Sequence, residues 1–216
     1  GILAFAFVLL LLGVGGAFSA QGPDSSPGAP TPTPMSVNIS PSADAWVDAL
    51  WPTGNYGNDT VLRVGSEECP GVEFPTRGRA LIRFSLSSIP AGQTIESATL
   101  YFYQRGALGA STNSISIRRA TSSWSESTVT WDTQPGRSAN SYAIVHVGTT
   151  INTWYQWDVT ELVREWYAGT YANYGMILLS GAESTCNQRI FESDEHAESH
   201  DPYLRVSYRA ATPTPT

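Results

Sequence analysis

Residues 98–103 read Ala-Thr-Leu-Tyr-Phe-Tyr, so that small or apolar side chains alternate with Thr99, Tyr101 and Tyr103. A period of two is typical of a β-strand with one buried face, because successive side chains point to opposite sides of a sheet. Residues 79–84, 114–118 and 203–208 show the same alternation. These stretches therefore predict strands of a half-buried sheet.

Further strand candidates are separated by clusters of Gly, Pro, Asn and Ser, which favour turns. They are residues 43–48, 61–64, 142–147, 175–180 and 188–192. About nine or ten short strands without helical crossovers predict an all-β fold, an antiparallel jelly-roll β-sandwich. One short helix is predicted between Asp158 and Gly169, because Asp158 and Glu161 fit a capping box and an apolar stripe runs from Leu162 to Trp166.

The composition supports a folded domain with a sizeable core and excludes several functions. The chain has 216 residues, of which 41% are hydrophobic and 14% charged, with seven Trp, ten Tyr and seven Phe. The net charge of −7 argues against a general nucleic-acid binder, which needs a basic face. All twelve basic residues are Arg. The lack of Lys excludes a Lys Schiff base, a phosphate-binding Walker Lys and a Ser–Lys dyad.

The chain divides into segments of different composition. Residues 1–20 are apolar and end in small residues, which predicts either a cleaved signal peptide or an uncleaved membrane anchor. Residues 21–36 predict a Pro/Thr/Ser-rich linker, residues 37–209 the β-sandwich, and residues 210–216 the start of a second Pro/Thr linker. Both interpretations of residues 1–20 predict an extracellular or cell-surface domain, which would contact the membrane only through an uncleaved N-terminal segment.

Cys69 and Cys186 are the only cysteines of the chain. Outside the cytoplasm an even number of cysteines favours a disulfide, which here would close a long loop. Two free thiols are the alternative. A metal site built on two cysteines lacks the usual paired spacing.

The order of several motifs resembles a known family. In chain order they are ADAWVDALWPTGNYGNDTVLRVG (43–65), RALIRFSLSSIPAGQTIESATLYFY (79–103), WSESTVTWDTQP (124–135), WDVTELVREWYAG (157–169), NYGMILLS (173–180), RIFESDE (189–195) and DPYLRVSY (201–208). This order resembles the DNRLRE-type extracellular domain, which is similar to carbohydrate-binding module family 96. The resemblance implies a non-catalytic jelly-roll module of multidomain surface proteins, also found beside polysaccharide lyases. Asp194 stands where a basic residue often precedes Glu195 in such domains.

The residues themselves indicate no catalytic constellation. The sequence has no G-x-S-x-G motif, and the two cysteines are better explained as a disulfide. Glu192, Asp194 and Glu195 are close in sequence, and such neighbours rarely flank a sugar from two sides as the carboxylates of a glycosidase do. We therefore expect no enzymatic activity.

The first loop of the predicted domain offers oxygen ligands suited to calcium. Asp44 and Asp48 precede Asn55, Asn58 and Asp59, and extracellular modules often bind calcium weakly through such groups. The alternative is that these side chains cap turns, because their spacing does not match a helix–loop–helix calcium site. Calcium, as a structural ion, is the one cofactor that the sequence suggests.

Sugar binding needs aromatic rings that water can reach, because the apolar faces of sugar rings stack on Trp and Tyr. Trp51 and Tyr56 lie in a turn-rich stretch, while Tyr101 and Tyr103 lie on the outward face of their strand. Trp154 and the next residue, Tyr155, have opposite faces, so one of them is a candidate for exposure.

Four arginines fall on the polar faces of their predicted strands, namely Arg63, Arg83, Arg118 and Arg205. If these strands are neighbours, the arginines form a platform for carboxylates, which suits a polysaccharide of uronic acids. The alternative is that each arginine pairs locally with Asp or Glu.

Together these features predict non-catalytic binding of an extracellular polysaccharide, with uronate-rich polymers as the candidate class. The other partners expected are neighbouring domains of a longer chain, and no nucleic acid. The alternative prediction is a structural spacer or adhesion domain without specific glycan binding, which the flanking Pro/Thr segments also favour.

Overall fold

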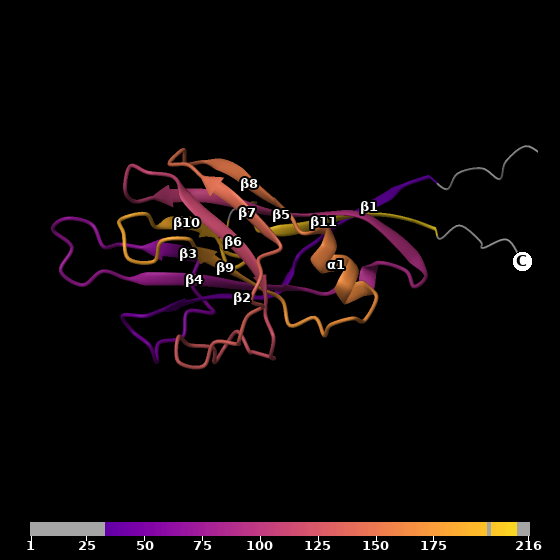
Figure 1. Cartoon of the computed structure of the whole chain (residues 1–216), viewed down its shortest axis with the longest axis horizontal. Coiled ribbons are helices and arrows are strands. Elements are labelled where there is room, and N and C mark those ends of the chain that lie inside the picture. The colour runs from indigo at the N-terminus through magenta and orange to yellow at the C-terminus, as the bar shows by residue number, and fades with distance from the viewer. Residues whose placement is uncertain (1–32, 198–199, 211–216) are drawn as a thin grey trace, which may run out of the picture. The chain divides into compact units, whose positions relative to one another are not determined.

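The computed structural model describes residues 33–197 and 200–210. Within them the chain forms eleven β-strands, one α-helix and one 3-10 turn (Figure 1). The strands are β1 (Met35–Ile39), β2 (Pro41–Asp48), β3 (Val61–Ser66), β4 (Arg77–Phe84), β5 (Gln93–Ala107), β6 (Asn113–Arg119), β7 (Ala143–Val147), β8 (Thr153–Asp158), β9 (Met176–Ser180), β10 (Arg189–Glu192) and β11 (Tyr203–Ala210). The helix is α1 (Thr160–Tyr167), and the 3-10 turn is η1 (Leu86–Ser88).

The predicted signal peptide or anchor, most of the first linker and residues 211–216 lie outside the described residues. Among the residues that are described, no helix combines the length and the apolar character needed to cross a bilayer.

The strands form one continuous, curled, antiparallel sheet. Its order is β1-β11-β5-β10-β3-β4-β9-β6-β7, with β2 beside β4 and β8 beside β5. β3 joins the two layers of this sheet, because residues 61–64 pair with β10 and residues 65–66 pair with β4. The predicted all-β sandwich with one short helix is confirmed, whereas its jelly-roll connectivity stays a prediction.

Two strands of the described chain, β1 and β8, are missing from the strands predicted by alternation. β1 pairs with β11 from Met35 opposite Tyr208 to Ile39 opposite Leu204. The first strand thus begins at Met35, two residues before the predicted start of the sandwich, and it forms the edge of the sheet beside β11.

The alternating apolar residues meet in a core between the two layers. Leu100 and Phe102 of β5 join Ile82 of β4 and Ile115 of β6 in one buried cluster. Trp157 of β8 lies in the same cluster, and its indole N–H donates to the carbonyl of Ile115 at 3.0 Å. Removing these side chains from water is the main favourable term in folding, so the core explains why the alternation predicts the strands.

A second apolar cluster covers the outer surface of β2, β4 and β9. Residues 120–142, which connect β6 to β7, fold over this surface, and we call them the covering loop. Trp124 and Val129 of the covering loop pack on Ala45, Leu81 and Ile177. As a result, β9 is buried at every position.

The helix α1 packs its predicted apolar stripe into the main core, with Leu162 and Trp166 buried. Its N-cap is Val159 rather than the predicted Asp158. The Asp158 carboxylate instead accepts hydrogen bonds from the N–H and the hydroxyl of Thr160, at 2.9 and 2.6 Å. Gly169 follows the helix with a φ of 74°, a left-handed conformation that glycine adopts without strain.

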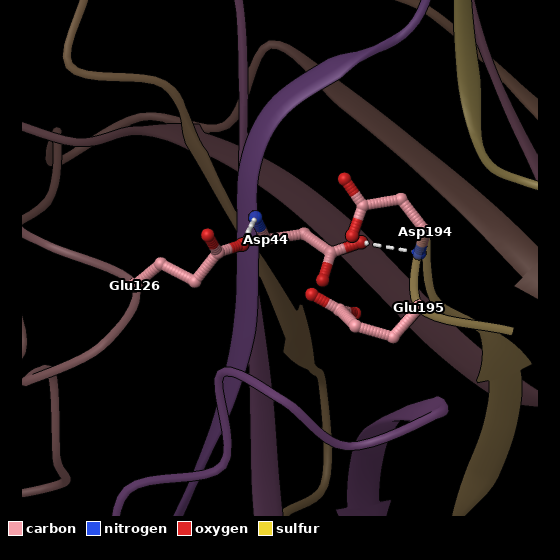
Figure 2. Close-up of side chains that lie close together, drawn as sticks. All are labelled: Asp44, Glu126, Asp194 and Glu195. Carbon is pink, nitrogen blue, oxygen red and sulfur yellow. Dashed lines mark hydrogen bonds between the residues drawn. The ribbon is translucent and has the colours of Figure 1, made fainter.

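β5 pairs with neighbours along both of its edges. On one edge, β8 pairs with residues 99–104. On the opposite edge, β11 pairs with residues 93–101 and β10 pairs with residues 104–107, so these two strands lie end to end along β5. Residues 193–202 connect β10 to β11, and we call them the crossing loop. This loop leaves the sheet and reaches β2, where the N–H of Asp194 donates to Asp44 Oδ2 at 3.1 Å (Figure 2).

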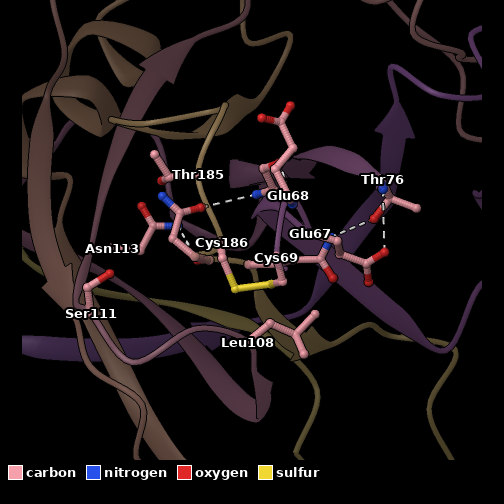
Figure 3. The surroundings of a disulfide bond; sticks show 12 residues. Glu67, Glu68, Cys69, Thr76, Leu108, Ser111, Asn113, Thr185 and Cys186 are labelled. Atoms are coloured by element: carbon pink, nitrogen blue, oxygen red, sulfur yellow. Dashed lines mark hydrogen bonds between the residues drawn. A yellow bond between two sulfur atoms is a disulfide. The ribbon is translucent and has the colours of Figure 1, made fainter. Parts of the chain in front are cut away.

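The predicted disulfide between Cys69 and Cys186 is present and joins residues 117 positions apart (Figure 3). It ties the segment after β3 to the segment before β10. A Cβ atom at Gly109 would lie 1.9 Å from the carbonyl oxygen of Cys186, so only glycine fits beside the bridge.

Arg189, the first residue of β10, is fully buried, which the sequence does not predict. Its guanidinium donates hydrogen bonds to six backbone carbonyl oxygens, those of Leu108, Ser111, Val147, Gly148, Asn187 and Gln188. Burial lowers the pKa of Arg189 below its usual value. The carbonyl dipoles replace the lost water, and they fasten the segments after β5, after β7 and before β10 to one cation.

We predict that Arg189→Met lowers the free energy of unfolding by about 3 kcal/mol or more, because several buried carbonyl oxygens lose their donor. Urea unfolding at neutral pH measures this loss. The matched control is Arg205→Met at an exposed position, which should change stability by less than about 0.5 kcal/mol. Equal midpoints for the two variants would contradict the role of Arg189.

We also predict that the double substitution Cys69→Ala with Cys186→Ala lowers the free energy of unfolding by about 2–5 kcal/mol, because the unfolded chain gains freedom when the long loop opens. The same urea titration, with and without a reductant, checks this. The reductant should destabilise the wild type and leave the double variant unchanged, and a wild type indifferent to reduction would count against the bridge.

Candidate functional site

Four aromatic side chains gather on the outer surface of β5, β8 and β11. The strand register places Tyr101 opposite Tyr203 and Tyr103 opposite Trp154. These residues point away from the core because the alternate positions of the same strands fill it. We call Tyr101, Tyr103, Trp154 and Tyr203 the aromatic face.

The rings of the aromatic face hold one another in defined orientations. Tyr101 and Tyr203 stack with their centroids 4.5 Å apart and their planes 8° apart. Trp154 stands across the tyrosines, 5.3 Å from Tyr203 at 69° and 5.3 Å from Tyr103 at 66°. His200 of the crossing loop stacks on Tyr103 at 4.0 Å. Each such pair contributes about 0.5–1.5 kcal/mol, so the face is ordered before any ligand arrives.

The aromatic face remains open to solvent. Trp154 exposes 38% of its surface although several rings contact it. Burial and the neighbouring Tyr101 raise the pKa of Tyr203, while Arg205 acts in the opposite direction. The phenol of Tyr203 therefore stays protonated at neutral pH and can donate as well as accept hydrogen bonds.

Arginines flank the aromatic face. Arg205 follows Tyr203 on the same side of β11, and Arg105 follows Tyr103 on the same side of β5; both are exposed. Arg105 also contacts the Nε2 atom of His196 in the crossing loop. The surface thus combines stacked rings with cations at its margins.

A separate acidic cluster lies where the crossing loop meets β2. One carboxylate oxygen from each of Asp44, Glu126, Asp194 and Glu195 lies within 4.8 Å of the others. Figure 2 shows the Asp44 side chain directed at the carboxylates of Asp194 and Glu195. Glu126 comes from the covering loop and accepts a hydrogen bond from the N–H of Asp44 at 2.7 Å.

The proximity of these carboxylates shifts their protonation. Burial, followed by the charges of Asp194 and Glu195, raises the pKa of Asp44 to about 9. Burial and a hydrogen bond with Glu195 raise the pKa of Asp194 to about 6. The cluster therefore favours the binding of protons or other positive charge, because this reduces the repulsion between its carboxylates.

The other three arginines of the predicted sugar platform lie elsewhere. Arg63 of β3 forms an ion pair with Glu67 at 3.3 Å. Arg83 of β4 lies over the ring of Trp124, and Arg118 of β6 donates to two carbonyl oxygens, both contacts being in the covering loop. The structure does not bring the four arginines together, because their strands belong to different layers and three of them have local partners.

The predicted aromatic residues of the first loop are also separate from the aromatic face. Trp51 is 61% exposed, but its loop packs against the covering loop, where the N–H of Asp132 donates to the carbonyl of Pro52 at 3.1 Å. Tyr56 stacks on Trp46 at 4.3 Å and is half-buried. Neither ring extends the face formed by Tyr101 and Tyr103.

The residues predicted to bind calcium mainly hold loops in place. Asp48 accepts hydrogen bonds from two backbone N–H groups, Asn55 donates to two carbonyl oxygens of the covering loop, and Asp59 accepts from an indole N–H. Asn58 is exposed. Of this set, Asp44 alone belongs to the acidic cluster.

The match with a known protein family covers nearly all of the folded unit. Residues 35–208 match the description "Carbohydrate-binding module family 96". The chain belongs to this family. The family resemblance stated from the motifs is thereby confirmed, and the aromatic face is a surface of a carbohydrate-binding module.

The family 96 module is also similar to parts of much longer bacterial proteins. The chain is 27% identical over 195 residues to the tRNA nuclease WapA of Bacillus subtilis strain 168, and this match covers 83% of the chain but 8% of that protein. The tRNA3(Ser)-specific nuclease WapA of Bacillus spizizenii is 26% identical over 186 residues, a match that covers 80% of the chain and 8% of that protein. The chain thus matches about a twelfth of the length of these relatives.

The sequence only partly indicates the aromatic face of the module. Alternation points to Tyr101 and Tyr103 and leaves Trp154 as one of two candidates. The alternation over residues 203–208 places Tyr203 on the polar side of its strand and does not mark it as a binding residue. His200 reaches Tyr103 only because of the direction in which the crossing loop runs, and no local pattern in residues 193–202 predicts that direction.

Proposed function

We propose that this module binds an extracellular polysaccharide on the aromatic face without catalysing a reaction. The observation that supports the proposal most strongly is the group of Tyr101, Tyr103, Trp154 and Tyr203, which is ordered on one sheet surface and partly open to solvent. The disulfide between Cys69 and Cys186 supports a location outside the cytoplasm.

Stacking is the physical basis of the proposed binding. The C–H faces of sugar rings bury apolar area against Trp and Tyr while their hydroxyl groups stay solvated. Because Trp154 is already braced by Tyr103 and Tyr203, little side-chain entropy is lost when a sugar binds. A row of rings on an open sheet surface suits one stretch of a long polymer.

The charges beside the face favour an acidic polymer. Arg205 and Arg105 place two exposed cations next to Tyr203 and Tyr103, and guanidinium groups bind carboxylates bidentately. A chain of uronic acids offers a sugar ring for stacking and a carboxylate for Arg in the same repeat.

We further propose that the module itself is not a nuclease. The relatives that carry this name are long proteins of which the matching region is 8%. The net charge of −7 opposes the approach of tRNA phosphates. The nuclease activity of those relatives is most simply placed in their remaining length.

We predict that Trp154→Ala weakens binding to a soluble polyuronate, such as polygalacturonate, by about tenfold or more, because the most exposed ring of the face is lost. Calorimetry on the whole chain measures the dissociation constant. The matched control is Phe74→Ala, which removes an aromatic ring that is 66% exposed in the loop after Cys69, and it should leave the constant unchanged within about twofold.

Unchanged binding by the Trp154 variant would mean that the sugar binds somewhere other than the aromatic face. Failure of the wild type to bind either polygalacturonate or a neutral β-glucan would favour the spacer or adhesion role. Cleavage of either polymer, or of tRNA, by the purified chain would contradict the non-catalytic assignment.

We predict that Arg205→Ala weakens polygalacturonate binding several-fold at low salt and flattens its salt dependence, because one carboxylate contact is lost. Dissociation constants measured at about 50 mM and about 300 mM NaCl test this. Arg137→Ala, at an exposed position of the covering loop, is the control and should keep the wild-type slope. A wild-type affinity that does not change with salt would be compatible with sugar stacking on the aromatic face but would contradict the proposal that the polymer is uronate-rich.

A further inference from the structure

The acidic cluster joins three segments that are distant in sequence. Asp44 lies on β2, Glu126 in the covering loop, and Asp194 and Glu195 in the crossing loop (Figure 2). None of the ion pairs formed within residues 33–197 and 200–210 involves any of these four carboxylates. Four carboxyl groups therefore converge without a protein cation to offset their charge.

A second observation points to a ligand at this place. Asp44 is only 1% exposed, and its Oδ1 atom is buried without a hydrogen-bond partner among the described residues. The Oε2 atom of Glu195 is buried and unpartnered in the same way. A buried carboxylate oxygen without a partner costs about 1–3 kcal/mol or more, so a bound ion that accepts electron density from these oxygens would remove this cost.

We propose that Asp44, Glu126, Asp194 and Glu195 form a calcium site. Calcium takes six to eight oxygen ligands at about 2.3–2.6 Å, so oxygens bound to one ion lie within about 5 Å of one another. The carboxylate oxygens of the cluster meet this condition, because they lie within 4.8 Å. The site is distinct from the first-loop set predicted from the sequence, with which it shares Asp44.

The donor set favours calcium over other common metals. All four side chains offer hard oxygen atoms, whereas zinc prefers His and Cys ligands. Three of the carboxylates lie in loops rather than on rigid strands. Calcium tolerates such irregular geometry, while magnesium requires a nearly ideal octahedron and retains its waters.

The bound ion would fasten both loops to β2. Already without an ion, the N–H of Asp194 donates to Asp44, and the N–H of Asp44 donates to Glu126. Each of these bonds orients one carboxylate of the cluster. Calcium would add direct bonds between the same three segments, and the folded state would gain stability because the unfolded chain does not assemble the site.

We predict that 10 mM CaCl2 (roughly a hundredfold excess over a dissociation constant of about 0.1 mM) raises the melting temperature of the EGTA-treated whole chain by about 5–10 °C. Asp44→Asn and Asp194→Asn should each reduce this shift to less than about 2 °C. Asp132→Asn, an exposed position of the covering loop, is the matched control and should keep the full shift. Calorimetric titration with CaCl2 should give one site per chain.

Several results would overturn this assignment. They are a wild type whose melting temperature and titration heat do not respond to calcium, variants that keep the full response, and an equal response to MgCl2. In EGTA, Asp44→Asn should melt close to the wild type, because the Asn amide has nearly the same shape as the protonated Asp44 carboxyl group. If this variant does not fold, Asp194→Asn alone decides. No glycan enters the test, so its outcome is independent of the proposed sugar binding.

Discussion

Each edge of a β-strand can pair with only one neighbour at a given position, and β5 satisfies this limit by sharing one edge between β10 and β11. With β8 on the opposite edge, the segment between β10 and β11 has no place in the sheet. The crossing loop must therefore leave the surface at Ser193 and return at Tyr203. The acidic cluster depends on this excursion, because the loop contributes Asp194 and Glu195 to it, and the same loop borders the aromatic face through His200.

The two ends of the crossing loop reach different parts of the molecule. Asp194 and Glu195 extend to Asp44 on β2, while His200 stacks on Tyr103 at 4.0 Å. Between these ends, Glu192 Oε2 lies 3.4 Å from the Nδ1 atoms of both His196 and His200. His196 and His200 thus share one carboxylate of β10 at the margin of the aromatic face.

Alternation along single strands predicted most of the fold, because the core selects one face of each strand regardless of where its neighbours lie. The same reasoning placed Tyr101 and Tyr103 outward. It did not place Arg189, which reads as a polar residue at the start of a strand but is enclosed by carbonyl oxygens from three separate segments. It also missed the acidic cluster, because Asp44 and Asp194 are 150 positions apart. Contacts of this kind depend on the arrangement of the layers, which a period of two does not encode.

The arginine platform shows why residue type alone does not identify a binding surface. Both outer surfaces of the sandwich carry Arg and Trp, but the covering loop lies over one of them. On that side Arg79 donates to Gln134 of the covering loop at 3.0 Å, and Trp124 is only 8% exposed. On the open side Trp154 is 38% exposed, beside an exposed Arg205. Arg and Trp side chains thus hold the covering loop on one layer, whereas other Arg and Trp side chains remain available to a ligand on the other layer. The path of residues 120–142 therefore determines which of the two surfaces is open to a sugar.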